Sequence, residues 1–136
     1  MTAYLADTSA MARRGRPAVA AVLEPRVDAR QVLLCVLVVG ELLRGTDAGA
    51  VGRLREALSW FPSVRLHEAI GQRGLDVQAL LAERGQHTGV SIVDLLVAAA
   101  AEANDLTVLH YDRDFDRIAE ITGQPTEWVV PAGTAE

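Results

Sequence analysis

Four acidic residues stand where a carboxylate is unexpected, because each one interrupts or ends an apolar segment. They are Asp7, Glu41, Asp94 and Asp112. Hard divalent cations such as Mg²⁺ and Mn²⁺ prefer carboxylate oxygens as ligands. Such a cation, once bound, can hold a phosphodiester oxygen and lower the pKa of a bound water. If the fold gathers these side chains, they predict metal-assisted hydrolysis of a phosphodiester bond.

Two of these acids are far from any other charge in the sequence. Glu41 is the only charged residue between Gln31 and Leu43, and Asp94 is the only one over residues 88–101. Two carboxylates about 5 Å apart, at an effective dielectric constant near 20, repel each other by roughly 3 kcal/mol. Several such pairs would remove a large part of a domain stability of about 5–15 kcal/mol. A cluster therefore requires protons or cations that neutralise it.

Each acid taken alone also has a purely structural explanation. Asp7 and Asp112 suit the N-caps of helices. Asp94 follows a serine by three residues, which resembles a capping box. Glu41 and Arg44 are spaced to form an ion pair on an exposed helical face. The two interpretations differ in whether the four carboxylates meet.

The elements that must position these residues alternate between strands and helices along the chain. The predicted strands are 4–6, 31–35, 106–110 and 128–130, with 64–66 as an edge strand or a linker. The predicted helices are 8–12, 18–23, 39–44, 48–61, 67–84 (as one helix or two), 92–104 and 112–122. This alternation predicts an α/β fold, a three-layer α/β/α sandwich with a mostly parallel sheet of about five strands.

The predicted elements place the acids near one edge of that sheet. Asp7 and Asp112 directly follow strands, and ligands of open parallel sheets bind at the carboxyl ends of strands where the strand order reverses. Asp94 lies in the first turn of the helix before the strand that leads to Asp112. Glu41 lies in the helix that follows the second strand. These placements allow all four to lie at this edge, but the sequence alone does not show that they meet.

Composition limits the class of protein. The 136 residues suit one domain, 1–136, and the net charge is −5 with all 13 basic residues being arginine. The single cysteine, Cys35, excludes an internal disulfide and a CxxC zinc site. No signal-peptide pattern begins the chain, and the longest apolar run, 32–40, is too short to span a bilayer. We expect a cytoplasmic protein without membrane contact.

Nucleic-acid binding by an acidic chain must depend on local arginines or on a bound cation. The densest basic cluster comprises Arg13, Arg14 and Arg16, while Arg44 and Arg113 lie close in sequence to the candidate acids. We expect these five side chains to contact the phosphates of a bound nucleic acid. The alternative for the first three is an ordinary solvated loop.

Five segments in this order resemble PIN-domain ribonucleases, specifically the VapC toxins of type II toxin–antitoxin modules. They are LADTSA at 5–10, VGEL at 39–42, DLLVAA at 94–99, LHYDRDFD at 109–116 and WVVPAG at 128–133. Each segment alone is weak, but their order and spacing in a chain of this length are specific. The resemblance extends over nearly the whole chain.

This resemblance implies Mg²⁺- or Mn²⁺-dependent cleavage of RNA that leaves a 5′-phosphate and a 3′-hydroxyl. By position, Asp7, Glu41, Asp94 and Asp112 match the acidic catalytic residues of the family. The implied metal ligands are Asp7, Asp94, Asp112 and Asp114, and Glu41 completes the site or acts as a base on the attacking water. The implied partners are an RNA substrate, a cognate antitoxin that blocks the site and a second copy of the chain in a homodimer.

One position departs from the family pattern. Family members often have Ser or Thr two residues before the last acid, but His110 stands there. We therefore expect different hydrogen bonding around Asp112, from a histidine that either packs or orients substrate. Thr8 or Ser9 is expected to orient a carboxylate or to bind a metal-bound water.

Two other functions compete with the nuclease. A catalytically inactive PIN-fold module that binds RNA or a protein partner would keep the fold but lose an acid, and none is missing. A phosphoryl-accepting receiver or an aspartate-nucleophile phosphatase also has an Asp after its first strand. Those families use a lysine, which this chain lacks, and Ser9 stands where the phosphatases have a second Asp.

Overall fold

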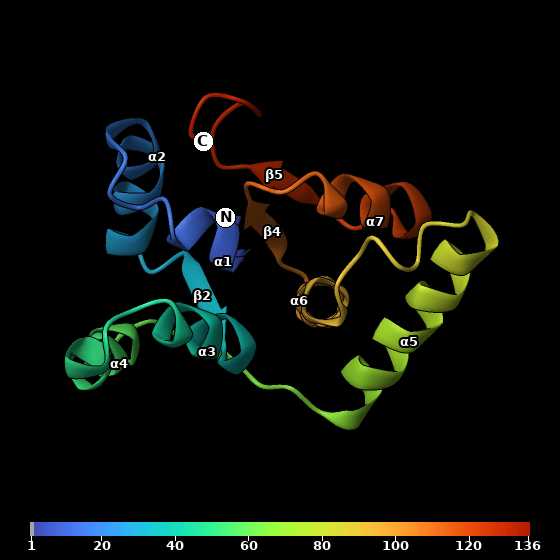
Figure 1. The fold of residues 1–136 in the computed structure, drawn as a ribbon, viewed down its shortest axis with the longest axis horizontal. Helices are drawn as coiled ribbons and strands as arrows, with labels where there is room; N and C mark the ends of the chain where they lie inside the picture. The colour runs from blue at the N-terminus through green and yellow to red at the C-terminus, as the bar shows by residue number, and fades with distance from the viewer. Residues whose placement is uncertain (1) are drawn as a thin grey trace.

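The computed structural model describes residues 2–136, which form a five-stranded parallel sheet between two groups of helices (Figure 1). The order of the strands across the sheet is β3-β2-β1-β4-β5. The strands are β1 Tyr4–Ala6, β2 Val32–Cys35, β3 Ser63–Val64, β4 Thr107–His110 and β5 Thr126–Trp128. The predicted α/β sandwich with a parallel sheet is confirmed.

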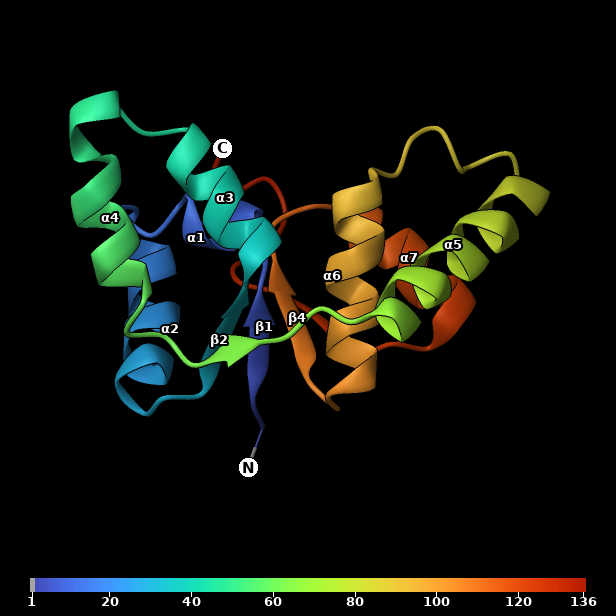
Figure 2. The same ribbon diagram turned by 90° about the horizontal axis from the view of Figure 1, so that it is seen from below.

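Helices connect the strands and cover both faces of the sheet. In Figure 2, α2 and α4 lie on one side of the strands, and α5, α6 and α7 lie on the other. The α-helices are α1 Thr8–Met11, α2 Pro17–Asp28, α3 Val36–Arg44, α4 Val51–Leu58, α5 Glu68–Glu83, α6 Ile92–Ala103 and α7 Asp114–Thr122, and a 3₁₀ turn, η1, spans Ala48–Ala50.

The strand order reverses between β1 and β4. From β1 the chain adds β2 and then β3 on one side, and it returns to place β4 and β5 on the other side of β1. The register pairs Ala6 with Leu109, so the two strands end at the same level. The backbone N–H of Asp7 donates to the Leu109 carbonyl at 2.9 Å. The residues that follow β1 and β4 therefore leave the sheet side by side.

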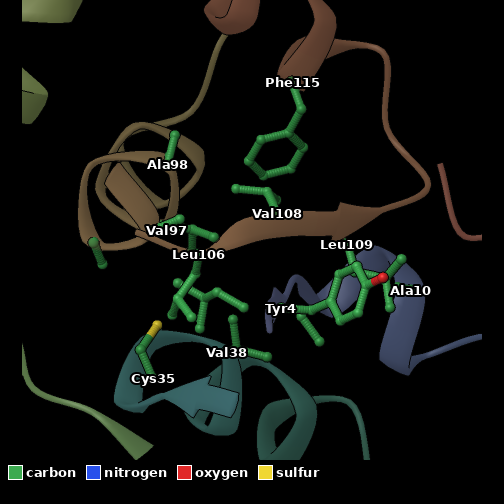
Figure 3. Packing of buried hydrophobic residues seen from close by; sticks show 14 of the residues in the cluster. Tyr4, Ala10, Cys35, Val38, Val97, Ala98, Leu106, Val108, Leu109 and Phe115 are labelled. Carbon is green, nitrogen blue, oxygen red and sulfur yellow. The ribbon is translucent and has the colours of Figure 1, made fainter. Parts of the chain in front are cut away.

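The central strands are buried on both faces, as expected for a sheet covered by helices on each side. Leu5, Val108 and Leu109 have no exposed surface. In Figure 3, Val108 points toward Phe115 of α7, and the next residue, Leu109, points to the other side of β4. This alternation is the normal geometry of a strand, and it gives each face of the sheet its own apolar layer.

Two predicted boundaries are wrong near apolar segments. The helix predicted to end near Pro25 continues to Asp28 as α2, because a proline removes one backbone donor but the apolar face, including the buried Leu23, still packs on the core. The helix predicted from 39 begins at Val36, directly after β2. Apolar residues that serve equally well in a strand or a helix carry no local signal for such a boundary.

Three further boundaries in the structure differ from those predicted, at β5, at α7 and in the segment 48–61. The last strand is 126–128 and not 128–130, since its pairing with β4 begins at Thr126. Helix α7 begins at Asp114, with Arg113 as its N-cap, and the Asp112 side chain accepts a hydrogen bond from the Asp114 N–H. The helix predicted over 48–61 comprises η1 and α4 and ends at Leu58.

Candidate active site

All the acids singled out in the sequence line one open hollow of about 440 Å³ at the carboxyl edge of the sheet, at the point where the strand order reverses. The acidic members of its lining are Asp7, Glu41, Asp94, Asp112 and Asp114. The other residues of the lining are Thr8, Ser9, Ala12, Arg13, Gly89 and Ser91. The hollow therefore combines side chains from the ends of β1 and β4 with others from α3 and α6.

Asp7 is the most buried of these acids, with 3% of its surface exposed. It is the N-cap of α1, and its Oδ2 accepts hydrogen bonds from the Ser9 N–H at 3.0 Å and the Ser9 hydroxyl at 2.6 Å. Its Oδ1 is buried without a hydrogen-bond partner among the described residues. Burial raises the pKa of Asp7, with a smaller contribution from the nearby Glu41. The cap thus holds one oxygen of Asp7 and leaves the other without a partner among residues 2–136.

Glu41 reaches the hollow from the second turn of α3. The Thr8 hydroxyl donates a hydrogen bond of 2.6 Å to Glu41 Oε1. Among residues 2–136, Glu41 has no salt bridge with Arg44, so the ion pair weighed from the sequence is not formed. The carboxylate faces the other acids and not a cation on its own helix.

Asp94, Asp112 and Asp114 form the tightest group of carboxylates. Each offers one oxygen that lies within 4.8 Å of an oxygen of the other two. Asp94 stands in the first turn of α6, where Ser91 Oγ accepts a hydrogen bond from the Asp94 N–H at 3.1 Å. Asp112 Oδ1 accepts from the Asp114 N–H at 2.9 Å, which fixes the turn between β4 and α7. The Ser91 cap expected from the sequence exists, but the N-cap of α7 is Arg113 and not Asp112. The two hydrogen bonds orient the acids instead of excluding a cluster.

Electrostatics in this group oppose full ionisation. Burial, followed by repulsion from Asp7, Asp112 and Asp114, raises the pKa of Asp94 to about 7. Burial and repulsion from Asp112 also raise the pKa of Asp114, although Arg117 and Arg113 partly offset this. These shifts mark a place where negative charge lacks compensation.

The donor set suits a hard divalent cation. Every candidate ligand atom is a carboxylate oxygen, which Mg²⁺ and Mn²⁺ prefer. The unpartnered buried Oδ1 of Asp7 adds a further oxygen at the same hollow. A cation bound by Asp94, Asp112 and Asp114 would remove the repulsion that adds to burial in raising the pKa of Asp94. Asp7 is not part of this group of three, although it lines the same hollow.

Ser9 connects the two loops that carry the acids. Its hydroxyl donates to Asp7 Oδ2 at 2.6 Å and accepts from the Tyr111 N–H at 2.9 Å. These two contacts join the start of α1 to the turn after β4. Ser9 and Tyr111 are 102 positions apart in the sequence. Of the two roles expected for Thr8 and Ser9, the described residues show the orientation of carboxylates.

His110 packs inside the protein and supports Asp112. It has no exposed surface and lies against the rings of Phe115 and Trp128, each with a centroid distance of 5.0 Å. Its Nδ1 accepts a hydrogen bond from the Asp112 N–H at 3.1 Å. Burial lowers the pKa of His110 to about 4, so the ring is neutral and can accept this bond. The histidine therefore orients the turn that carries Asp112.

Among the five arginines singled out, only Arg13 lines the acidic hollow. Its guanidinium donates to the carbonyls of Ser9 and Ala135, both at 2.9 Å, and lies 4.4 Å from the centre of the Tyr111 ring. Arg14 instead forms a two-bonded pair with Glu24, with both distances 2.7 Å.

The other three arginines are exposed. Arg16 donates to the backbone carbonyl of Glu136. Arg44 ends α3, and Arg113 follows Asp112 beside the hollow. The structure thus separates one arginine held at the site from others that point to solvent or to structural partners.

Two contacts at the site went unrecognised in the sequence. Arg117 Nη1 lies 3.2 Å from Asp114 Oδ1 in an i, i+3 pair, a spacing that the sequence displays. The Ala135 carbonyl that holds Arg13 is 122 positions away from it, and no short-range sequence pattern indicates this contact.

No helix within residues 2–136 is long and apolar enough to cross a membrane.

Comparisons with known proteins agree with this geometry. Residues 4–121 match the PIN domain family. The chain is 46% identical to a protein named Ribonuclease VapC51 from Mycobacterium tuberculosis over 136 residues, which cover 98% of this chain and 97% of that protein.

Solved structures show the same fold. VapBC2 from Rickettsia felis, bound to a DNA fragment from its promoter, matches with a TM-score of 0.76 at 18% identity and covers 93% of this chain and 99% of the other. A toxin–antitoxin complex from Klebsiella pneumoniae matches with a TM-score of 0.68 at 22% identity, with 94% and 98% covered.

Proposed function

This chain belongs to the PIN domain family, and on that premise we propose that it is a Mg²⁺- or Mn²⁺-dependent endoribonuclease that a cognate antitoxin inhibits. The observation that carries the proposal is the meeting of five carboxylates in one hollow, including a buried Asp7 oxygen that has no partner within residues 2–136. The name Ribonuclease VapC51 of a relative 46% identical supports RNA as the substrate.

Asp7, Asp94 and Asp112 would hold the cation, and Asp114 is the further candidate ligand. When bound, the cation neutralises charge on the scissile phosphate and makes a bound water more acidic. Ser9 keeps Asp7 oriented, and the Asp114 N–H keeps Asp112 oriented, through the hydrogen bonds described above. These contacts hold the ligand oxygens in place before the substrate arrives.

Glu41 is proposed as the base. Thr8 occupies Oε1, which leaves Oε2 to accept a proton from the attacking water. The water oxygen bonds to phosphorus while the bond from phosphorus to the 3′-oxygen breaks. The leaving 3′-oxygen takes a proton from solvent, so the products carry a 5′-phosphate and a 3′-hydroxyl.

The direct test is cleavage of total RNA by the purified protein with Mg²⁺, followed by mapping of new 5′ ends. We expect ends that carry a 5′-phosphate, and we expect none when the metal is chelated or in the Asp94→Asn variant. Cleavage that persists in both controls would refute the assignment. Binding of RNA without cleavage in any metal would favour the catalytically inactive module.

The antitoxin that blocks the acidic site is proposed to pack as well on an apolar hollow that lies apart from the acids. This hollow of about 410 Å³ lies between β2, β3, α3 and α4, and Val36, with 68% of its surface exposed, lies on its edge. The toxin–antitoxin complex that shares this fold supports such a partner. Exposed apolar surface of this kind marks interaction sites more often than chance.

We also propose that residues 1–136 act as a single cytoplasmic domain that forms a homodimer. Light scattering of the purified protein tests the dimer, and a mass that stays at the 14.6 kDa of one chain at every concentration would contradict it.

A further inference from the structure

A second hollow adjoins the acidic one and shares residues with it. It has a volume of about 410 Å³, and its walls include Arg13, Tyr111, Asp112, Arg113 and Trp128. Arg13 and Asp112 also line the acidic hollow, so the two spaces meet along these side chains. A chain that crosses the acids can therefore continue into the second hollow.

The aromatic wall of this hollow is held firmly in place. Trp128 at the end of β5 packs edge-on against Tyr111, with ring centroids 5.3 Å apart and an interplanar angle of 82°. Its indole N–H lies 3.2 Å from Asp116 Oδ1, to which it donates. Trp128 is only half-buried, although it touches the core residue His110. An indole fixed at its edge, with part of its surface open to a hollow, can accept a flat ligand.

The basic wall is equally well positioned. Three contacts hold Arg13: the carbonyls of Ser9 and Ala135, and the Tyr111 ring. Tyr111 in turn accepts a hydrogen bond from the Ala135 N–H on its hydroxyl at 2.9 Å. Arg113 is exposed on the same rim. Two guanidinium groups thus flank the passage between the acids and the indole.

We propose that this second hollow is a nucleotide subsite, in which one unpaired base of the RNA stacks on Trp128 while Arg13 and Arg113 contact the phosphates beside the cleaved bond. The inference rests on the proposed nuclease function and extends it to the form of the substrate. A stacked base must leave its neighbours, so the subsite selects single-stranded RNA over a duplex. Stacking on an aromatic ring together with arginine contacts is the usual way of binding single strands.

The two tryptophans of the chain allow a direct test. Trp60 is 75% exposed and lines neither hollow, so Trp60→Phe leaves Trp128 as the only indole fluorophore. We would add Asp94→Asn to prevent cleavage and titrate this protein with a short oligoadenylate carrying a terminal dye. Dye anisotropy reports binding, and Trp128 emission reports stacking.

The expected result is quenching of Trp128 emission that saturates together with the anisotropy. An oligonucleotide of the same length with abasic sugars should bind without equal quenching. The matched protein with Trp128→Phe and Asp94→Asn, which keeps Trp60, should show no quenching. Trp128→Leu should weaken oligoadenylate binding about 5- to 150-fold, the range for loss of one stacked base.

Several outcomes would overturn the subsite. They are unchanged Trp128 emission at saturation, equal quenching by the abasic strand, equal affinity for duplex RNA, or no binding at all. If Trp128→Leu fails to fold, the quenching of Trp128 itself still decides the matter. Quenching without RNA cleavage by the unmodified chain would refute the nuclease and keep the subsite. Cleavage without quenching would refute the subsite alone.

Discussion

The Thr8 hydroxyl donates a hydrogen bond of 2.6 Å to Glu41 Oε1 and so joins two residues that are 33 positions apart. Thr8 begins α1 after the first strand, and Glu41 lies within α3 after the second. This contact sets which oxygen of the proposed base remains free. It also shows that the site depends on residues between the acids as well as on the acids themselves.

Removal of that hydroxyl should slow the reaction without unfolding the protein. In Thr8→Val, the Glu41 carboxylate loses its partner and the orientation that the partner imposes. A hydrogen bond to a charged group contributes about 1.5–3 kcal/mol, which corresponds to a fall in kcat of roughly 10- to 150-fold. Initial rates on RNA measure this, and Thr8→Ser should keep most of the activity. A rate in Thr8→Val equal to that of the unmodified chain would show that Glu41 does not need this contact.

Ser9 should matter for stability as well as for activity. Ser9→Ala removes the donor to Asp7 Oδ2 and the acceptor for the Tyr111 N–H. The Tyr111 N–H then loses its partner near the core, and Asp7 Oδ2 keeps only the Ser9 N–H, so we expect a loss of about 1–3 kcal/mol in the free energy of unfolding. Urea titration in the presence and absence of Mg²⁺ measures it. Ser9→Thr retains the hydroxyl and serves as the control, and a loss as large in Ser9→Thr would argue against the hydroxyl as the cause.

Mg²⁺ should raise the melting temperature through the acids. A ligand that binds only the folded state at 100 times its Kd stabilises it by about 2.7 kcal/mol, a rise of roughly 10 °C for a domain of this size. Differential scanning calorimetry with and without Mg²⁺ measures the shift. We expect Asp7→Asn and Asp94→Asn to lose most of it, while Asp105→Asn, at a turn outside the acidic hollow, retains it. A shift that survives in both site variants would place the cation elsewhere.

The metal-free protein should lose stability as the pH rises toward neutrality. The folded protein holds the pKa of Asp94 at about 7, whereas the ordinary value is 3.8, mainly because the side chain is buried. Between about pH 4 and about pH 7 the folded state therefore binds more protons than the unfolded state, so the free energy of unfolding falls with increasing pH.

Melting temperatures measured over this pH range, with a chelator present, test the prediction. Asp94→Asn cannot ionise, so its melting temperature should change less with pH. Saturating Mg²⁺ should also flatten the curve of the unmodified chain. If the slope is the same in Asp94→Asn, another group carries the pH dependence.

Two adjacent arginines should differ in their effect on RNA binding. Arg13 lines the acidic hollow, but Arg14 is paired with Glu24. Arg13→Ala should weaken binding and reduce the slope of log affinity against log salt concentration by about 1, since one phosphate contact is lost. Arg14→Ala should leave that slope unchanged. Titrations at several salt concentrations decide this, and equal slopes in the two variants would remove Arg13 from the RNA contacts.

Much of the architecture followed from local patterns in the sequence. Apolar runs and their turn residues predicted the order of strands and helices, and therefore a parallel sheet with Asp7 and Asp112 at its carboxyl edge. Boundaries were less well predicted. Pro25 lies inside a helix, and Val36 begins one, because packing on the core outweighs the local preference of a single residue.

The chain's residues alone specified which side chains were available for chemistry and at which strand ends they stand, because hydrophobic periodicity and helix caps act over a few positions. Folding determined the rest. Three features depend on how distant segments pack. They are the Asp7 Oδ1 that lacks a partner among the described residues, the contact of Thr8 with Glu41, and the different partners of Arg13 and Arg14. Arg13 meets a carbonyl 122 positions away, and no short-range pattern encodes a contact of that length.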